Sequence, residues 1–316
     1  MNSQPFIFCI SVNCSPITAV MLNSFHRHHP TCVIHVMGTQ SDFEQLGPIA
    51  QHPNTRLVNV GGNAQLMQKF KQGHQGTTSI FAMVIQKMFD AHSLQGGNQY
   101  DRFIHIDGDM YFKRESISIL EAAFAHGYDI VGTRRCYGNN PSGVQGLEQW
   151  PDTVSTFIFG MKLAKIPHYD FDKMCRYCEG AEHPLGWLVL DAFDGVTHAT
   201  MQNGGTIHYL DQNQFGSQCV NGKKHNNYPS NMHMDVGSHT IHWGGVGSGY
   251  AHYHGHSKPE AGYANWACGR WKLFAQVFYQ KTVEYNEPTQ YTPDGRWKCG
   301  QHDEKIYWGI INDMMN

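Results

Sequence analysis

Two aspartates that lie one residue apart form the strongest chemical motif in the sequence. Asp107 and Asp109 follow the apolar run Phe103 to Ile106, with Gly108 between them. We expect Gly108 to let the backbone turn, so that both carboxylates enter one loop and share a hard cation with diphosphate oxygens. An isolated Asp-x-Asp is more often a simple turn that closes a strand. The apolar strand before it favours a Mg²⁺ or Mn²⁺ site here.

The aspartates must be positioned by strands and helices that alternate along the first part of the chain. Expected strands cover residues 6–12, 32–37, 56–60, 102–106 and 128–132, and expected helices cover 17–27, 77–92 and 116–125. This alternation predicts an α/β sandwich with a largely parallel sheet. Ligands of such sheets bind at the carboxyl ends of the strands, which is where we place Asp107 and Asp109.

The chain changes in character from about Cys136. Strand-like runs recur at 154–159 and 206–210, whereas residues 222–263 are so rich in Gly, His, Asn and Ser that we expect long loops there. Aromatic residues recur at helical spacing from Trp266 to Tyr279. This spacing favours a helix packed on the core over a surface that stacks on sugars.

Bulk composition limits the classes of function. With 316 residues and 41% hydrophobic content, the chain can bury a large core. Lys and Arg total 23 against 26 Asp and Glu, for a formal charge of -3. Binding along a nucleic-acid backbone needs a basic excess that this composition lacks, so a nucleic-acid acceptor is disfavoured.

The cysteine count and the character of the first residues favour a cytoplasmic protein. The nine cysteines are an odd number, which indicates free thiols in a reducing compartment. Residues 1–15 carry no positively charged segment and resemble a strand, so we do not expect a secretory signal. We also expect no transmembrane helix, because no stretch combines the length and apolar character that one needs.

Three motifs occur in an order that is similar to one enzyme family. Asp107 and Asp109 come first, Asp211-Gln212 follows, and residues 252–259 read His-x-x-Gly-x-x-Lys-Pro. This order, over residues 6–259, resembles the retaining family 8 glycosyltransferases of the GT-A fold, the glycogenin-like and lipopolysaccharide galactosyltransferase group. The chain departs from that pattern at Glu260, where the family has Trp, and at Gln86 and Lys87, where an Arg is expected.

The resemblance implies both a fold and a reaction. The fold would be a Rossmann-like nucleotide-sugar-binding sandwich. The reaction would be metal-dependent transfer of a sugar from a nucleotide-sugar donor, a UDP-sugar by resemblance, to a hydroxyl acceptor such as a glycan, with retention at the anomeric carbon. Residues 1–135 would form the nucleotide-sugar-binding half, and residues 136–316 would bind the acceptor and complete the active site within one continuous domain.

The resemblance also assigns roles to residues. Asp107 and Asp109 would bind Mn²⁺ or Mg²⁺ together with His252, and Gly255 and Lys258 would contact the donor's diphosphate. The positive charge of Lys258 would then stabilise the leaving diphosphate. The remaining residues beside the donor would be Asp211 and Gln212 at the transferred sugar, Ser11, Val12 and Asn13 at the uridine, and Lys87.

His242 competes with His252 for the place of third metal ligand. It ends an apolar run and precedes Gly244 and Gly245, whose backbone could pass close to phosphate. One imidazole nitrogen beside two carboxylates suits Mn²⁺ better than Mg²⁺. We favour His252 and keep His242 as the alternative.

Other chemistries stay open. An inverting enzyme would need a carboxylate on the acceptor side, for which Asp191, Asp194 and Asp235 are available. A nucleotidyltransferase typically has a Gly-rich, basic loop near its first strand, and residues 11–18 lack one. A non-catalytic carbohydrate- or metal-binding protein would leave the buried strand before Asp107 without a function. We therefore expect a glycosyltransferase.

Overall fold

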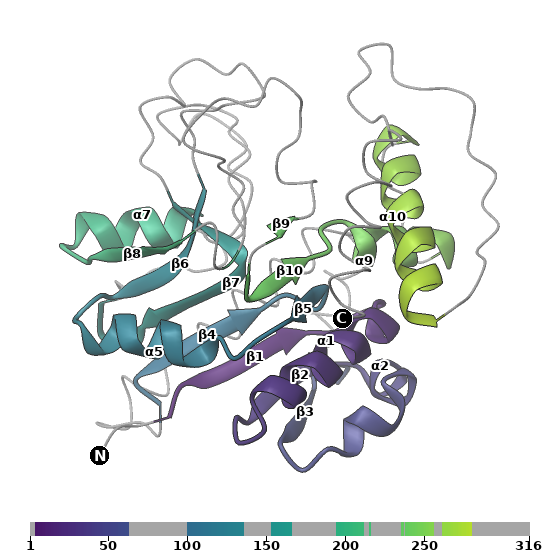
Figure 1. The fold of residues 1–316 in the computed structure, drawn as a ribbon, viewed down its shortest axis with the longest axis horizontal. Coiled ribbons are helices and arrows are strands. Elements are labelled where there is room, and N and C mark those ends of the chain that lie inside the picture. The colour runs from purple at the N-terminus through teal and green to yellow at the C-terminus, as the bar shows by residue number, and fades with distance from the viewer. Residues whose placement is uncertain are drawn as a thin grey trace.

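The computed structural model describes residues 4–62, 100–135, 153–165, 194–211, 215, 235–236, 238–255 and 261–279. These residues form two β-sheets and the helices that pack around them (Figure 1). The helix expected at 77–92 lies outside the described residues. Within the described part of the chain, no helix is both long enough and apolar enough to cross a membrane.

The larger sheet has seven strands in the order β3-β2-β1-β4-β7-β6-β8. Their bounds are β1 Phe6–Ile10, β2 Ile34–Gly38, β3 Thr55–Asn59, β4 Arg102–Ile106, β6 Ile130–Arg135, β7 Thr153–Lys162 and β8 Ile207–Leu210. Strand β7 runs antiparallel to β4 and β6, and every other neighbouring pair is parallel. The mostly parallel α/β sheet that the sequence predicts is confirmed.

The order of the strands reverses beside β1. Strand β1 pairs in parallel with β2 on one side and with β4 on the other. The chain builds β2 and β3 outward in one direction and then returns to the opposite side of β1 at β4. In open α/β sheets, ligands bind outside the carboxyl ends of the strands at such a reversal. Asp107 follows β4 directly and therefore lies at this edge.

The helices and 3-10 helices are α1 Ser15–His28, α2 Gln40–Gln45, η1 Gly47–Gln51, α5 Ile117–Ala125, η3 Leu163–Lys165, α7 Asp194–Gln202, α9 Val246–Tyr253 and α10 Ala261–Tyr279. Helix α1 has Pro16 in its first turn, where the missing N–H costs no hydrogen bond. Met21 and Phe25 of α1 and Leu120 of α5 are fully buried in one cluster with residues of β1 and β4. Both helices thus cover the same core.

A second, antiparallel sheet has the order β5-β10-β9. Its strands are β5 Met110–Phe112, β9 Asp235–Val236 and β10 Thr240–His242. Strand β5 starts directly after Asp109, and β10 pairs with it so that His242 is opposite Met110. This small sheet therefore brings a late segment of the chain to the end of β4 (Figure 1).

The expectation of long loops over residues 222–263 is wrong where that region is described. It contains β9, β10 and α9, and α10 starts within it. Strands of two or three residues are too short to show an alternation of apolar and polar residues. The glycines of α9 are unfavourable in helices, so its sequence does not predict one. A Cβ at Gly249 would lie only 1.9 Å from the carbonyl oxygen of Ala267. Glycine at this position therefore permits the close packing of α9 on α10.

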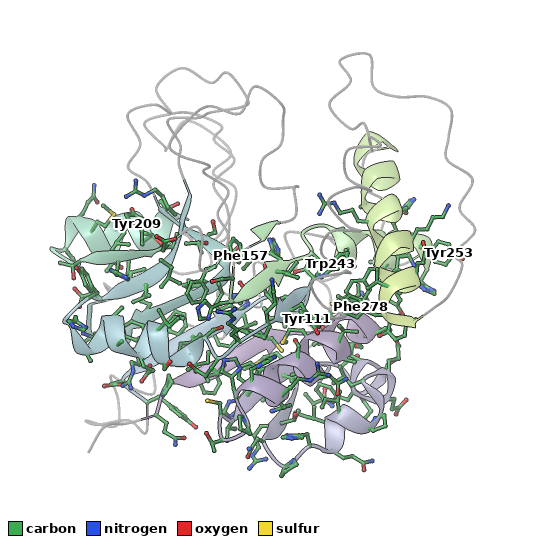
Figure 2. All side chains as sticks on the ribbon, in the orientation of Figure 1. Tyr111, Phe157, Tyr209, Trp243, Tyr253 and Phe278 are labelled. Carbon is green, nitrogen blue, oxygen red and sulfur yellow. The ribbon has the colours of Figure 1, made fainter. Side chains whose placement is uncertain are left out.

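The aromatic residues in the second half of α10 pack against the core, as their spacing predicts. Trp271 and Phe274 are buried in a cluster with Trp243, which follows β10. Phe278 contacts both Trp243 and Tyr111, with 5.6 Å between the ring centroids in each pair (Figure 2). Helix α10 therefore packs against β5, which follows the turn formed by Asp107, Gly108 and Asp109 (the aspartate turn), and against the residue that follows β10.

Candidate functional site

Three main-chain hydrogen bonds stabilise the aspartate turn. The amide of Asp107 donates to the carbonyl oxygen of Phe157 at 2.8 Å, which extends the pairing of β4 with β7 by one residue. The amide of Met110 donates to the Asp107 carbonyl at 3.3 Å and closes the turn. The carbonyl of Asp109 accepts from the amide of Trp243 at 3.0 Å. Both carboxylates therefore project from a backbone that two sheets hold in place.

Gly108 is needed for a different reason from the expected one. The positive φ angles among the described glycines occur at other positions, so a special backbone conformation does not explain it. A Cβ at Gly108 would lie 2.6 Å from Oγ1 of Thr18 and 3.4 Å from the carbonyl oxygen of Ile10. Glycine thus lets the turn pack closely against α1 and the end of β1.

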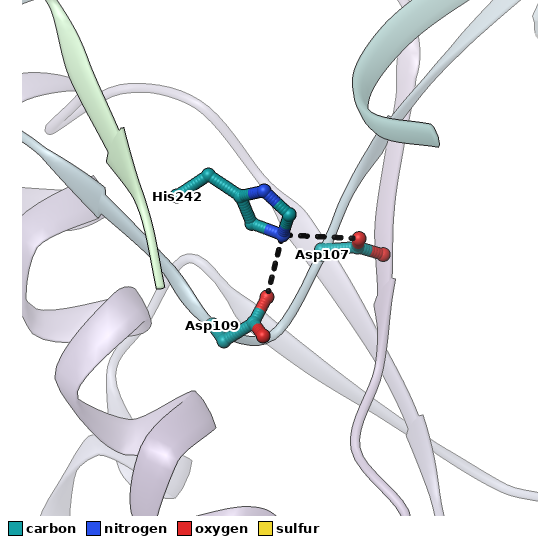
Figure 3. Close-up of side chains that lie close together, drawn as sticks. All are labelled: Asp107, Asp109 and His242. Carbon is teal, nitrogen blue, oxygen red and sulfur yellow. Dashed lines mark ion pairs between the residues drawn. The ribbon is translucent and has the colours of Figure 1, made fainter. Parts of the chain in front are cut away.

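The aspartates and His242 form a group that could bind a metal ion. Nε2 of His242 lies 3.4 Å from Oδ1 of Asp109 and 3.9 Å from Oδ2 of Asp107 (Figure 3). One ligand atom from each residue lies within 4.8 Å of the others. Two carboxylates brought this close repel each other unless a positive charge is shared between them. Two carboxylate oxygens and one imidazole nitrogen are a ligand set that fits Mn²⁺.

The imidazole of His242 is buried and has a fixed orientation. Its ring stacks on Phe157, with 4.6 Å between the centroids and 15° between the planes. The side chain of Asp107 is 35% exposed and that of Asp109 is 16% exposed. The histidine of the group is therefore packed in the interior, whereas the carboxylates, above all that of Asp107, are partly exposed.

His105 is a further buried group beside the turn that sequence reasoning missed. Its Nε2 lies 3.7 Å from Oδ1 of Asp107, and its Nδ1 lies 2.9 Å from the carbonyl oxygen of Thr156. Burial lowers the pKa of His105 to about 4, so the ring is neutral at pH 7. A neutral ring beside a carbonyl must carry its proton on Nδ1, which leaves Nε2 as an acceptor. The position of a histidine two residues before Asp107 was the available signal.

The structure brings His242 to the aspartates, in the group that could hold a metal. His252 lies in the last turn of α9, and its carbonyl accepts from the amide of Gly255 at 3.0 Å. Among the described residues, the group that could hold a metal comprises Asp107, Asp109 and His242 without His252. Gly255 is exposed and has a positive φ of 75°. Lys258, Lys87 and Gln212 lie outside the described residues.

The expected uridine-contacting residues follow β1, the strand that pairs directly with β4. Ser11 is buried, and its amide donates to the carbonyl of Met37 at 2.8 Å. Val12 is half-buried. Asn13 is exposed and has a φ of 55°, which is the left-handed region that residues other than glycine rarely adopt. The structure thus places an unusual exposed turn at the carboxyl end of β1.

Asp211 lies at the carboxyl end of β8, on the same edge of the sheet as Asp107. It is exposed, and its carbonyl accepts from the amide of Phe215 at 3.1 Å. Phe215 is fully buried, and its carbonyl accepts from Oγ1 of Thr240 at 3.0 Å. Thr240 is in β10, two residues before His242. Phe215 therefore links Asp211 to the strand that carries His242.

Two of the three carboxylates that could serve an inverting reaction lie in described elements. Asp194 begins α7, and Asp235 in β9 is the register partner of His242. Asp191 lies outside the described residues.

Comparisons with known sequences find no match, and comparisons with solved structures find weak similarities. No protein-family model matches the chain, and no curated protein matches its sequence. Mouse xyloside xylosyltransferase 1 is similar over 67% of this chain and 86% of its own, with 15% identity and a TM-score of 0.46. The galactosyltransferase LgtC, solved with donor and acceptor sugar analogs, is similar over 66% of this chain and 74% of its own, with 13% identity and a TM-score of 0.41.

The bifunctional glycosyltransferase WbbM is similar over 68% of this chain and 40% of its own, with 12% identity and a TM-score of 0.40. All three are glycosyltransferases, and each of the three TM-scores is below 0.5. Likenesses this weak carry no argument about what this chain does. We therefore base the function on the geometry of the site.

Proposed function

We propose that the protein is a metal-dependent glycosyltransferase that uses a nucleotide-sugar donor, a UDP-sugar. The observation that carries this proposal is the convergence of Asp107, Asp109 and His242 at the carboxyl end of β4, beside the reversal in strand order. A metal bound by two carboxylates retains positive charge and open coordination positions for diphosphate oxygens. In open α/β sheets a nucleotide binds outside the carboxyl ends of the strands at such a reversal, which would place it next to that metal.

The positions of the other residues suggest how the donor lies. Asn13 is on the β1 side of the aspartate turn, and Asp211 is on the opposite side, at β8. A donor with its diphosphate at Asp107 and Asp109 would direct its nucleoside toward Asn13 and its sugar toward Asp211. This arrangement agrees with the roles that the sequence resemblance implies for these residues.

The chain's residues would act mainly by binding and orientation. A bound Mn²⁺ would supply Lewis-acid stabilisation of the leaving diphosphate. Asp107, Asp109 and the stacked His242 would fix the place of that charge, and Lys258 would add a second positive charge. The bond from the anomeric carbon to the diphosphate oxygen breaks and a bond to the acceptor oxygen forms. The proton of the acceptor hydroxyl passes to the departing diphosphate.

We propose that transfer proceeds with retention and that the acceptor is a glycan. Asp211 and Gln212 would face the transferred sugar and stabilise positive charge that develops at the anomeric carbon. Attack on the face from which the diphosphate leaves lets that diphosphate accept the proton. No separate carboxylate base on the acceptor side is then required.

Calorimetric titration with UDP, GDP, ADP and CDP, each with and without Mn²⁺, tests the proposal. We expect Mn²⁺-dependent binding of UDP that Asp109→Asn abolishes. Incubation with UDP-glucose or UDP-galactose should then release UDP as the sugar passes to water or to an added glycan, and incubation with UTP and the matching sugar 1-phosphate should release no diphosphate. Release of diphosphate from that mixture would identify a nucleotidyltransferase. Failure to bind any of the four nucleotides, with or without Mn²⁺, would contradict the proposal.

A further inference from the structure

Asp42 is a buried carboxylate that joins the two loops at the carboxyl ends of β1 and β2. It is 3% exposed and lies in the first turn of α2. Its Oδ1 accepts from the amide of Asn13 at 2.9 Å and from Oγ of Ser15 at 3.4 Å. Its Oδ2 accepts from the amide of Thr39 at 2.9 Å and from Oγ1 of Thr39 at 2.6 Å. One side chain thus holds the loops after both strands.

This carboxylate explains the unusual conformation of Asn13. A φ of 55° is unfavourable for a residue with a Cβ, although Asn tolerates it better than most. The hydrogen bond from the amide of Asn13 to Asp42 stabilises that conformation, because a charged acceptor makes a stronger bond than a neutral one. The exposed side chain of Asn13 is therefore presented at the end of β1 by a residue that is itself buried.

Helix α2 also contacts α9, the helix that follows His242. Oη of Tyr250 in α9 donates to Oε1 of Gln45 in α2 at 3.3 Å. A Cβ at Gly247 in α9 would lie 3.8 Å from Cβ of Cys14, so α9 also approaches the loop after β1. Asp42 therefore lies in the part of the structure that connects the turn at Asn13 with the segment after His242.

We infer that Asp42 is a positioning residue for nucleoside recognition: it sets the turn at Asn13 and so controls affinity for the nucleoside part of the donor, without contributing to the metal and diphosphate site. This inference rests on the proposed function, because it assigns the end of β1 to the nucleoside. Asp42 is buried and its carboxylate is occupied by the two loops, so its effect on the ligand would be indirect.

The variant Asp42→Asn tests this role, with UDP and inorganic diphosphate as probes in the presence of Mn²⁺. Whichever way the new amide lies, one main-chain N–H, of Asn13 or of Thr39, loses its acceptor. We expect the affinity for UDP to fall by about ten-fold or more, as for one lost hydrogen bond to a charged group. Affinity for inorganic diphosphate should not fall. Loss of a negative charge alone would strengthen the binding of both anions.

Asp129→Asn is a matched control. Oδ2 of Asp129, which is also buried, accepts from both the amide and Oγ1 of Thr206, at 3.0 and 3.1 Å. Asp129 precedes β6 and so lies at the amino edge of the sheet, opposite the candidate site. This variant should lose stability while it keeps the affinity for both probes.

The outcomes separate the inference from the proposed function. A selective loss of UDP affinity in Asp42→Asn, with Asp129→Asn unchanged, supports the inference. Equal UDP affinity in Asp42→Asn and the wild type, or a parallel loss of both probes, overturns it and leaves the proposed function intact. Absence of UDP binding by the wild type overturns both. If Asp42→Asn does not fold, Thr39→Val removes the hydroxyl bond at nearly constant volume and must show the same selectivity.

Discussion

The ring of Phe157 lies almost parallel to the imidazole of His242, with 4.6 Å between the centroids and 15° between the planes. The carbonyl of the same Phe157 accepts from the amide of Asp107 at 2.8 Å. One residue of β7 therefore fixes two members of the candidate metal site, the first through its side chain and the second through its main chain. A site held in this way loses little freedom when a metal binds.

Phe157→Leu should weaken Mn²⁺ binding although Phe157 is not a ligand. The smaller side chain keeps the core apolar but has no aromatic ring on which the imidazole of His242 can stack. We expect about ten-fold weaker Mn²⁺ binding, which is typical of lost support around a metal ligand. Phe25→Leu is the control, because Phe25 stacks on His29 in a similar way at 4.6 Å and away from the site. Calorimetry that shows equal Mn²⁺ affinity in the two variants would contradict this role.

Replacement of the two competing histidines should identify the third ligand. His242→Ala should weaken Mn²⁺ binding by about 100-fold, since removal of a direct ligand costs at least as much as removal of its support. His252→Ala should change it by less than about two-fold, because His252 is not a member of the group formed by Asp107, Asp109 and His242. Electron paramagnetic resonance of free Mn²⁺ measures both affinities. The reverse ranking would restore His252 as the ligand.

Gly108→Ala should destabilise the protein through one identifiable contact. The added Cβ meets Oγ1 of Thr18 at 2.6 Å, and overpacking of this kind costs about 1–3 kcal/mol. Thr18→Ala removes that oxygen, so the double variant should recover at least about 1 kcal/mol relative to the sum of the single changes. Urea unfolding of the four proteins measures the coupling. Strictly additive free energies would show that the clash is relieved in another way.

The sequence was sufficient to predict the parts of the site that depend on local pattern. Apolar runs of the right length predict the strand before Asp107 and the mostly parallel sheet. The Asp-Gly-Asp sequence predicts the loop that contains both aspartates. Asn13 and Asp211, to which the family resemblance assigns roles at the donor, both lie at the carboxyl edge of the sheet, and those roles stay predictions. The strand and the aspartate loop are local features, because each depends on residues that are adjacent in the chain.

Features that depend on distant contacts were not predictable from one sequence. His242 reaches the aspartates because β10 pairs with β5, and three-residue strands show no periodicity. Asp42 is acidic and lies in a short polar helix, where a solvent-exposed side chain is the usual expectation. Its burial follows from Asn13 and Thr39, which approach it from different loops. The need for glycine at position 108 likewise arises from Thr18.

Two glycines of α9 should respond very differently to the same substitution. A Cβ at Gly249 would lie 1.9 Å from the Ala267 carbonyl oxygen, and backbone cannot yield as a flexible side chain can. Gly249→Ala should therefore cost more than about 3 kcal/mol or prevent folding. Gly247→Ala meets only Cβ of Cys14 at 3.8 Å and should be neutral or stabilising by up to about 1 kcal/mol. Thermal unfolding of both variants gives the comparison, and similar melting temperatures would argue against the close contact of α9 with α10.

Buried histidines should make the protein less stable in acid. Burial, together with the nearby His52 and His29, lowers the pKa of His26 from its ordinary value of 6.5 to about 4. The unfolded chain then takes up a proton before the folded protein does, so stability is complete above pH 6.5 and falls as the pH drops toward 4. The loss from His26 alone should reach roughly 3 kcal/mol.

His26→Gln should reduce this pH dependence, because glutamine can keep a hydrogen bond to Thr55 but takes up no proton. Thr55→Val removes the hydrogen bond and leaves the histidine in place, so it should lower stability while the slope against pH persists. Urea unfolding between pH 4 and pH 8 separates the two effects. The same slope in His26→Gln as in the wild type would show that other groups control acid unfolding. His29 is the next group to replace in that case, since burial also lowers its pKa.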